Sequence, residues 1–152
     1  MFQYIFDQLS GISPIWYLLL GLILYNKFTS KITVAEEVEG SLVQKVDTNE
    51  IFNQTLKEND LVIADFYATW CGPCVQAAPI FAHLSKEFPN VRFIKIDVDK
   101  NKATATANKI SAMPTFKVFK NGGEVENITG FSEAKIRSLI SKYYSLTNKA
   151  KN

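Results

Sequence analysis

The sequence has only two cysteines and one histidine among its 152 residues. Two cysteines cannot build the disulfide framework of a small secreted domain, which favours a reducing compartment. A structural zinc site needs about four ligands, so Cys71, Cys74 and His83 are too few and we expect no bound metal. An iron–sulfur cluster shared by two copies of the chain stays open as an alternative.

Long runs of lysine or arginine are also missing, and the net charge is only +2. Nucleic acid is therefore not an expected partner, because its recognition would need a basic patch. Apolar residues make up 47% of the chain and charged residues 21%, which excludes wholesale disorder. The length suits one globular domain with an appendage.

From residue 41 onward, strand and helix patterns alternate. Residues 61–67 are nearly all apolar, as in a central strand covered on both faces, and Asn121-Gly122-Gly123 is a hairpin signal. We expect the order βαβαβαββα, over residues 41–46, 49–58, 61–67, 71–88, 91–96, 102–109, 115–120, 124–129 and 133–144. Parallel strands that pass to an antiparallel pair predict an α/β fold, a mixed sheet flanked by helices.

Charged residues are absent from residues 8–26. A helix of that length would measure about 28 Å, close to the hydrocarbon thickness of about 30 Å. The segment therefore predicts an N-terminal transmembrane helix. We expect a membrane anchor over residues 1–26, a polar linker over 27–40, the folded domain over 41–146 and a polar tail over 147–152.

Two other interpretations of this segment stay open, a cleaved signal peptide and a soluble packing helix. A signal peptide usually starts with positive charge, whereas here Asp7 precedes the apolar run and no small-residue cleavage site follows closely. For an anchor, Lys27 and Lys31 flank the far end. The positive-inside rule then predicts a single-pass membrane protein whose domain faces the cytosol or an equivalent reducing compartment.

Cys71 and Cys74 are separated by two residues and lie between a predicted buried strand and a helix. Such a pair can close a disulfide and exchange two electrons without any cofactor, which indicates thiol–disulfide exchange. Cys71 begins the helix, where free N–H groups and the helix dipole lower a thiol pKa. We expect Cys71 to attack and Cys74 to resolve from a less exposed position. Gly72 leaves the approach to Cys71 open, and Pro73 suits the first turn of the helix.

Asp65 is the one carboxylate in the apolar strand 61–67. Burial disfavours its charged form and should raise its pKa, which makes it a candidate proton acceptor near neutral pH. The alternative is an ordinary strand residue on a solvated face.

Several separate segments match one known family in the right order. They are residues 65–74 (DFYATWCGPC), Pro79, residues 95–97 (KID), residues 113–115 (MPT) and residues 121–122 (NG). Residues 41–146 therefore resemble the thioredoxin family, and the resemblance implies a thioredoxin-like fold and a protein-disulfide reductase. The implied partners are disulfide-containing protein substrates and a thioredoxin reductase, with the Cys71–Cys74 disulfide as the redox group in place of a cofactor.

The resemblance also implies roles for individual residues. Asp65 would deprotonate Cys74 through a water molecule, with Lys95 as the lysine near that carboxylate. Pro114 would follow a cis peptide bond, and the backbone of Met113 would pair with extended substrate. The substrate groove would be lined by Trp70, Gly72, Pro73, Gly130 and Phe131, although Trp70 could instead belong to the core.

Val75 departs from the family, which commonly has a lysine after the second cysteine. The rim then loses a positive charge, so we expect a different electrostatic choice of partner with the same reaction. Gly72-Pro73 between the cysteines resembles the reducing members. Two alternatives stay open: a lumenal oxidase or isomerase, and a non-catalytic thioredoxin-fold subunit of a membrane assembly.

Overall fold

The computed structural model describes residues 18–24 and 40–149. The chain divides into two units, residues 1–34 and 35–152. In the first, residues 18–24 are helical, and Leu18 and Leu22 are 68% and 62% exposed. Among the described residues, every helix is too short or too polar to cross a bilayer. Most of the anchor predicted over residues 1–26 and of the linker predicted over 27–40 lies outside the described residues.

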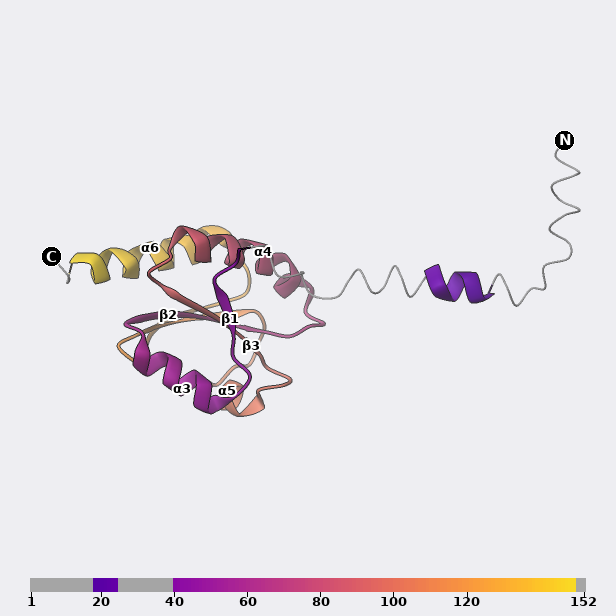
Figure 1. The fold of residues 1–152 in the computed structure, drawn as a ribbon, viewed down its shortest axis with the longest axis horizontal. Helices are drawn as coiled ribbons and strands as arrows, with labels where there is room; N and C mark the ends of the chain where they lie inside the picture. The colour runs from indigo at the N-terminus through magenta and orange to yellow at the C-terminus, as the bar shows by residue number, and fades with distance from the viewer. Residues whose placement is uncertain (1–17, 25–39, 150–152) are drawn as a thin grey trace, which may run out of the picture. The chain divides into compact units, whose positions relative to one another are not determined.

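The second unit has the predicted order βαβαβαββα (Figure 1). Its elements are β1 (Val43–Lys45), α3 (Asn49–Glu58), β2 (Leu61–Tyr67), α4 (Gly72–Glu87), β3 (Arg92–Asp97), α5 (Lys102–Ala107), β4 (Thr115–Lys120), β5 (Gly123–Thr129) and α6 (Glu133–Lys149). The predicted α/β class is thus confirmed for this unit.

The five strands form one mixed sheet in the order β1-β3-β2-β4-β5. Strand β3 runs parallel to both β1 and β2, whereas β4 runs antiparallel to β2 and β5. Strand β2 is central and buried along its whole length, as expected for a continuous apolar run.

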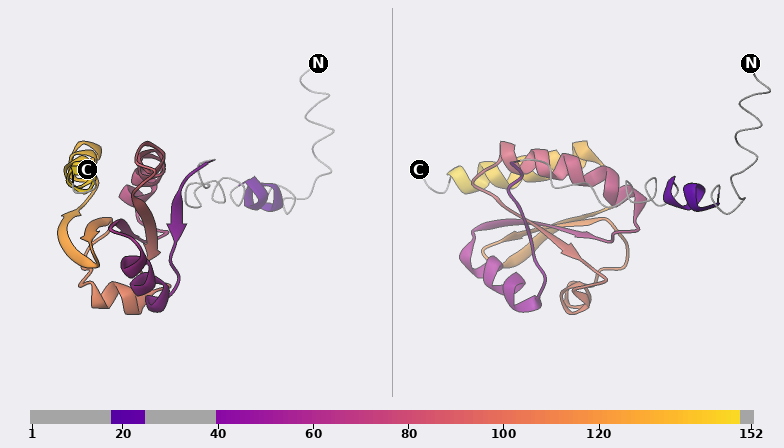
Figure 2. Two further views of the ribbon diagram at one scale, coloured as in Figure 1. Left: turned by 60° about the vertical axis from the view of Figure 1, so that its left-hand side comes forward. Right: turned by 45° about the vertical axis from the view of Figure 1, so that its right-hand side comes forward.

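Helices cover both faces of the sheet, α4 and α6 on one and α3 and α5 on the other (Figures 1 and 2). Because side chains alternate along a strand, β2 supplies both cores: Leu61 and Ile63 pack toward α4 and α6, and Val62 and Phe66 toward α3. On the first face, Phe81 of α4 lies against two rings of the sheet, 5.1 Å from Phe93 and 5.6 Å from Phe116 between centroids.

Helix boundaries differ from the expectation where the sequence holds no clear stop signal. Helix α5 ends at Ala107 because Lys109 takes a left-handed conformation, φ 55°, while the Ile110 N–H bonds the carbonyl of Ala105. Helix α6 continues to Lys149 instead of ending at Tyr144.

The chain enters the domain beside the C-terminal half of α4. The Leu42 N–H donates to the hydroxyl of Ser85 over 3.1 Å, and that hydroxyl donates to the carbonyl of Ala82 over 2.7 Å. Ser85 is completely buried, so this contact fixes the start of the domain to the helix.

Candidate active site

Cys71 and Cys74 form a disulfide at the N-terminus of α4, with an S–S distance of 2.11 Å. Cys71 is the N-cap residue, and its Sγ accepts the N–H of Cys74 over 3.2 Å. A sulfur in this position faces the free N–H groups of the first helical turn, which favour negative charge. The local geometry therefore suits a thiolate at Cys71 once the disulfide opens.

The approach to the disulfide passes over Gly72 and Pro73, which are both exposed. A Cβ atom at Gly72 would meet nothing within 4 Å, so the surface beside the sulfurs is open. The expected contrast between the two cysteines is small, because Cys71 is 5% exposed and Cys74 3%. In this oxidised form each cysteine is shielded by its bonded neighbour.

Asp65 lies within β2 and is 4% exposed, so the solvated-face alternative is wrong. By the alternation of the strand, its side chain is on the face of Leu61 and Ile63, which α4 covers. Its Oδ1 is buried and accepts no hydrogen bond among the described residues. Burial raises the pKa of Asp65 to about 7, and the positive charge of Lys95 opposes the rise.

Lys95 is the β3 partner of Asp65 in the parallel register. The two residues therefore lie side by side on adjacent strands and on the same face. The sequence alone gave this pairing only through the family resemblance, because it depends on how β2 and β3 align.

The Met113–Pro114 peptide bond is cis, as the resemblance implied. Pro114 is buried and Met113 partly exposed. The Pro114 carbonyl accepts the N–H of Gly130 over 2.8 Å, and Gly130 has φ +85°, a conformation that favours glycine. This contact ties the start of β4 to the end of β5.

The strand registers bring these segments to one edge of the sheet. Phe66 pairs with Thr115, so the end of β2, which leads to Cys71, meets the start of β4, which follows Pro114. Thr115 in turn pairs with Thr129, directly before Gly130. The cysteine, cis-proline and glycine segments of the predicted groove therefore share this edge.

Trp70 is 69% exposed, so its assignment to the core is wrong. Its indole Nε1–H donates to Oδ2 of Asp99 over 2.8 Å. Asp99 was not among the residues predicted from the sequence. The position after β3 was the available signal, because β2 and β3 are parallel and their carboxyl ends meet at one edge.

Carboxylates also influence Tyr67, the last residue of β2. Burial raises the pKa of Tyr67 to about 12, with further rises from the negative charges of Asp97, Asp65 and Asp47. The phenol therefore stays protonated at physiological pH and is not a candidate base.

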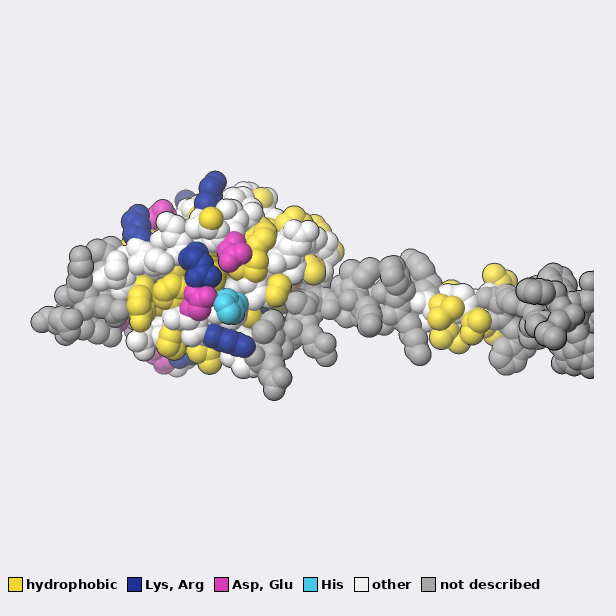
Figure 3. All heavy atoms as spheres, turned by 90° about the horizontal axis from the view of Figure 1, so that it is seen from above, with side chains coloured by type: hydrophobic (Ala, Val, Ile, Leu, Met, Phe, Trp, Pro, Cys, Tyr) yellow, Lys and Arg dark blue, Asp and Glu magenta, His cyan; other side chains and the backbone are white. Residues whose placement is uncertain are grey.

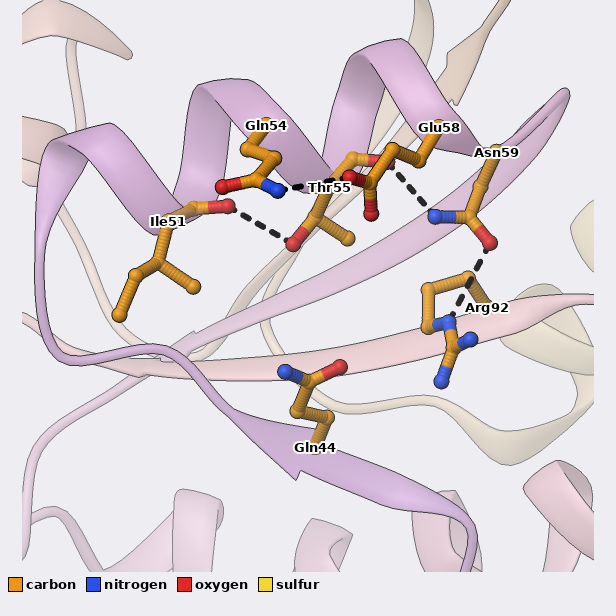
Figure 4. Close-up of a pocket in the computed structure, with 7 residues that line it drawn as sticks. All are labelled: Gln44, Ile51, Gln54, Thr55, Glu58, Asn59 and Arg92. Atoms are coloured by element: carbon orange, nitrogen blue, oxygen red, sulfur yellow. Dashed lines mark hydrogen bonds between the residues drawn. The ribbon is translucent and has the colours of Figure 1, made fainter.

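A separate hollow of 190 Å³ lies between α3 and the strands β1 and β3 (Figure 4). Its polar side chains largely bond one another: Gln54 donates to Glu58, and Arg92 to Asn59. Asn59 and Arg92 lie at the ends of β2 and β3 remote from Cys71. The hollow is thus not part of the disulfide site.

The surface over α4 and α6 mixes acidic, basic and apolar side chains (Figure 3). Arg137 of α6 bonds Glu87 of α4, which lowers the pKa of that carboxyl. Within residues 18–24 and 40–149, His, Cys, Asp and Glu side chains do not gather in threes that could hold a metal ion.

Comparisons with known proteins match the same region. A family model described as Thioredoxin matches residues 43–142. A thioredoxin from Geodia cydonium is 46% identical over 104 residues, 66% of this chain and 98% of that protein. Thioredoxin 1 from Plasmodium falciparum (isolate 3D7) is 40% identical over 102 residues, 67% of this chain and 98% of that protein.

Solved structures agree with these relatives. The solution structure of oxidised thioredoxin from Plasmodium falciparum superposes with a TM-score of 0.64 at 40% identity, over 67% of this chain and 98% of that one.

Proposed function

This chain belongs to the thioredoxin family and is a thioredoxin-type disulfide reductase, and from that premise we propose that its reduced Cys71–Cys74 pair passes two electrons to disulfides of partner proteins. The observation that carries the proposal is the disulfide at the open N-terminus of α4, on the face of β2 that holds the buried carboxylate of Asp65.

In the first step, the Cys71 thiolate attacks one sulfur of a substrate disulfide. A bond forms between Cys71 and that sulfur, the substrate S–S bond breaks, and the other substrate sulfur leaves as a thiolate. The N–H groups at the start of α4 support this role because they favour the anion at Cys71.

In the second step, Cys74 gives its proton to Asp65 and attacks the sulfur of Cys71. The Cys71–Cys74 bond forms, the mixed disulfide breaks, and the second substrate sulfur leaves as a thiolate. The two substrate thiolates take protons from water, which completes the dithiol. A carboxyl with a pKa of about 7 is largely ionised just above neutral pH and can accept this proton. Lys95 tunes that pKa, and a thioredoxin reductase would return the two electrons.

The substrate contacts follow from the shared sheet edge. The exposed ring of Trp70 and the exposed Gly72 and Pro73 would contact the segment around the substrate cysteine. Met113, before the cis bond to Pro114, would offer its backbone to an extended chain, with Gly130 at the far side of the groove.

Serine variants of the two cysteines test this chemistry. Cys74→Ser should complete the first step and stop, so that a covalent complex with a disulfide-bonded protein such as insulin accumulates. The complex would appear on a non-reducing gel and vanish with dithiothreitol. Cys71→Ser is the matched control and should trap nothing. Failure of Cys74→Ser to trap any protein would favour the non-catalytic subunit.

We further propose that residues 8–26 anchor the protein in a membrane, with the domain on the cytosolic side or in an equivalent reducing compartment. Support comes from the uncharged run, from the exposed leucines of the helix over residues 18–24, and from Lys27 and Lys31 behind the run.

Protease protection of intact membranes tests this placement. Added protease should digest residues 41–152 without detergent. In a separate carbonate extraction of undigested membranes, the full chain should stay in the membrane fraction. A protected domain would support the lumenal oxidase or isomerase. Release by carbonate would refute the anchor.

A further inference from the structure

Trp70 combines high exposure with a fixed polar atom. Its side chain is 69% exposed, yet its single polar atom, the indole Nε1–H, donates to Asp99 over 2.8 Å. An indole this exposed has little packing to hold it in one rotamer. The hydrogen bond to Asp99 therefore orients the ring beside Cys71.

The loop that carries Asp99 is itself rigidly built. Oδ1 of the buried Asp97 accepts the N–H of Asp99 over 3.1 Å and the N–H of Lys100 over 3.3 Å. The Asp97 carbonyl accepts the N–H of Asn101 over 2.8 Å. These bonds close the chain into a tight turn after β3 and fix the backbone of Asp99.

A backbone hydrogen bond joins this turn to the loop that connects β2 to Cys71. The Val98 N–H donates to the carbonyl of Tyr67 over 2.9 Å, three residues before Trp70. Two hydrogen bonds therefore connect the turn after β3 to the end of β2 and the loop after it, one from the backbone N–H of Val98 and one to the side chain of Asp99.

We propose that Asp99 is a positioning residue that holds the indole of Trp70 as a preset contact surface for disulfide-bonded protein substrates. An aromatic ring already fixed in its binding orientation loses less freedom when a partner docks. The inference rests on the proposed reductase function, and it concerns protein substrates because the chain around a protein disulfide offers the ring more surface than a small disulfide does.

The effect should fall on substrate affinity and leave the chemistry of the sulfurs unchanged. Within the described part of the chain, Asp99 forms no hydrogen bond with either cysteine: its carboxylate accepts the indole N–H, and its own N–H bonds Asp97 within the turn. Loss of the acceptor should therefore raise the KM for a protein disulfide, with kcat nearly unchanged. The expected rise is about two- to tenfold, the ratio that corresponds to the net contribution of one hydrogen bond.

Three variants of the full-length chain separate the acceptor from the charge. Asp99→Leu removes both. Asp99→Asn removes the charge and keeps an acceptor oxygen. Asp60→Leu is the matched control, because Asp60 precedes β2, at the end of that strand remote from Trp70. Each is assayed on insulin and on 2-hydroxyethyl disulfide.

A structural readout accompanies the kinetics. In a Trp16→Phe background Trp70 is the single tryptophan, so its indole N–H gives one NMR signal from ¹⁵N-labelled tryptophan. Asp99→Leu should shift this signal and speed its exchange with water, while Asp99→Asn and Asp60→Leu should leave it near the wild-type position.

The proposal is supported if Asp99→Leu raises the insulin KM, spares the small disulfide within about twofold, and Asp99→Asn restores most of the affinity. It is overturned if the indole signal and the insulin KM of Asp99→Leu match wild type, if Asp60→Leu has the same effect, or if both substrates suffer equally. A wild-type chain inactive toward both disulfides would refute the reductase function, while the NMR comparison would still decide whether Asp99 orients the indole.

Discussion

Replacement of Asp65 by asparagine should stabilise the folded protein at neutral pH and slow its turnover. Burial raises the pKa of Asp65 from 3.8 to about 7. The unfolded chain therefore loses this proton near pH 4, whereas the folded domain keeps it until about pH 7. Between these values the folded state binds more protons, so its stability falls as the pH rises.

The size of the effect follows from the same two values. The interval between 3.8 and about 7 corresponds to at most about 4 kcal/mol, at about 1.36 kcal/mol per pH unit. Asp65→Asn has a similar shape and cannot ionise. Its free energy of unfolding should resemble wild type at pH 4 and exceed it increasingly up to about pH 8.

Guanidinium unfolding of the oxidised full-length protein at pH 4, 5, 6, 7 and 8 measures this difference. Asp47→Asn is the matched control, because Asp47 is an exposed carboxylate paired with Lys45, and a surface pair contributes at most about 1 kcal/mol. A difference between Asp65→Asn and wild type that is the same at pH 4 and pH 8 would refute the reasoning. Turnover of insulin should fall in Asp65→Asn, since Cys74 loses its proton acceptor.

Two further predictions concern the scaffold. Lys117 is 7% exposed and donates to the carbonyl of Asn108 and to Glu124, so Lys117→Ala should lower the free energy of unfolding by about 2–4 kcal/mol. Lys117→Met keeps most of the side-chain volume and should lose less stability than Lys117→Ala. Equal losses of stability in the two variants would show that the polar contacts of Lys117, and not its volume, stabilise the fold. Thr48 caps α3 by accepting the Ile51 N–H, so Thr48→Ala should cost about 1 kcal/mol in urea unfolding, while Thr48→Ser should stay within about half of that.

The sequence predicts the central elements of this fold because their physical signals are local. Strand β2 over Leu61–Tyr67 and strand β4 over Thr115–Lys120 have the predicted bounds. The first is an apolar run interrupted only by Asp65, and the second lies between Pro114 and the turn residues Asn121-Gly122-Gly123. The end of α5 could not be predicted, because Lys109 adopts a left-handed backbone that is uncommon for lysine.

The candidate site divides in the same way. The cysteine pair and the desolvated Asp65 follow from spacing and from a carboxylate in an apolar strand. The pairing of Asp65 with Lys95 and the bond from Trp70 to Asp99 depend on the register between β2 and β3. That register is set by tertiary packing, which a single strand pattern does not encode.

The hydrogen bond between Leu42 and Ser85 determines where the start of the domain lies relative to the disulfide. Ser85 follows Cys74 by eleven residues along α4, a helical distance of about 16 Å. The first described residues of the domain thus lie beside the end of α4 that is remote from its sulfurs. The start of the domain therefore leaves the surface around Cys71 and Cys74 uncovered, and a large protein substrate can approach the disulfide without meeting Leu42.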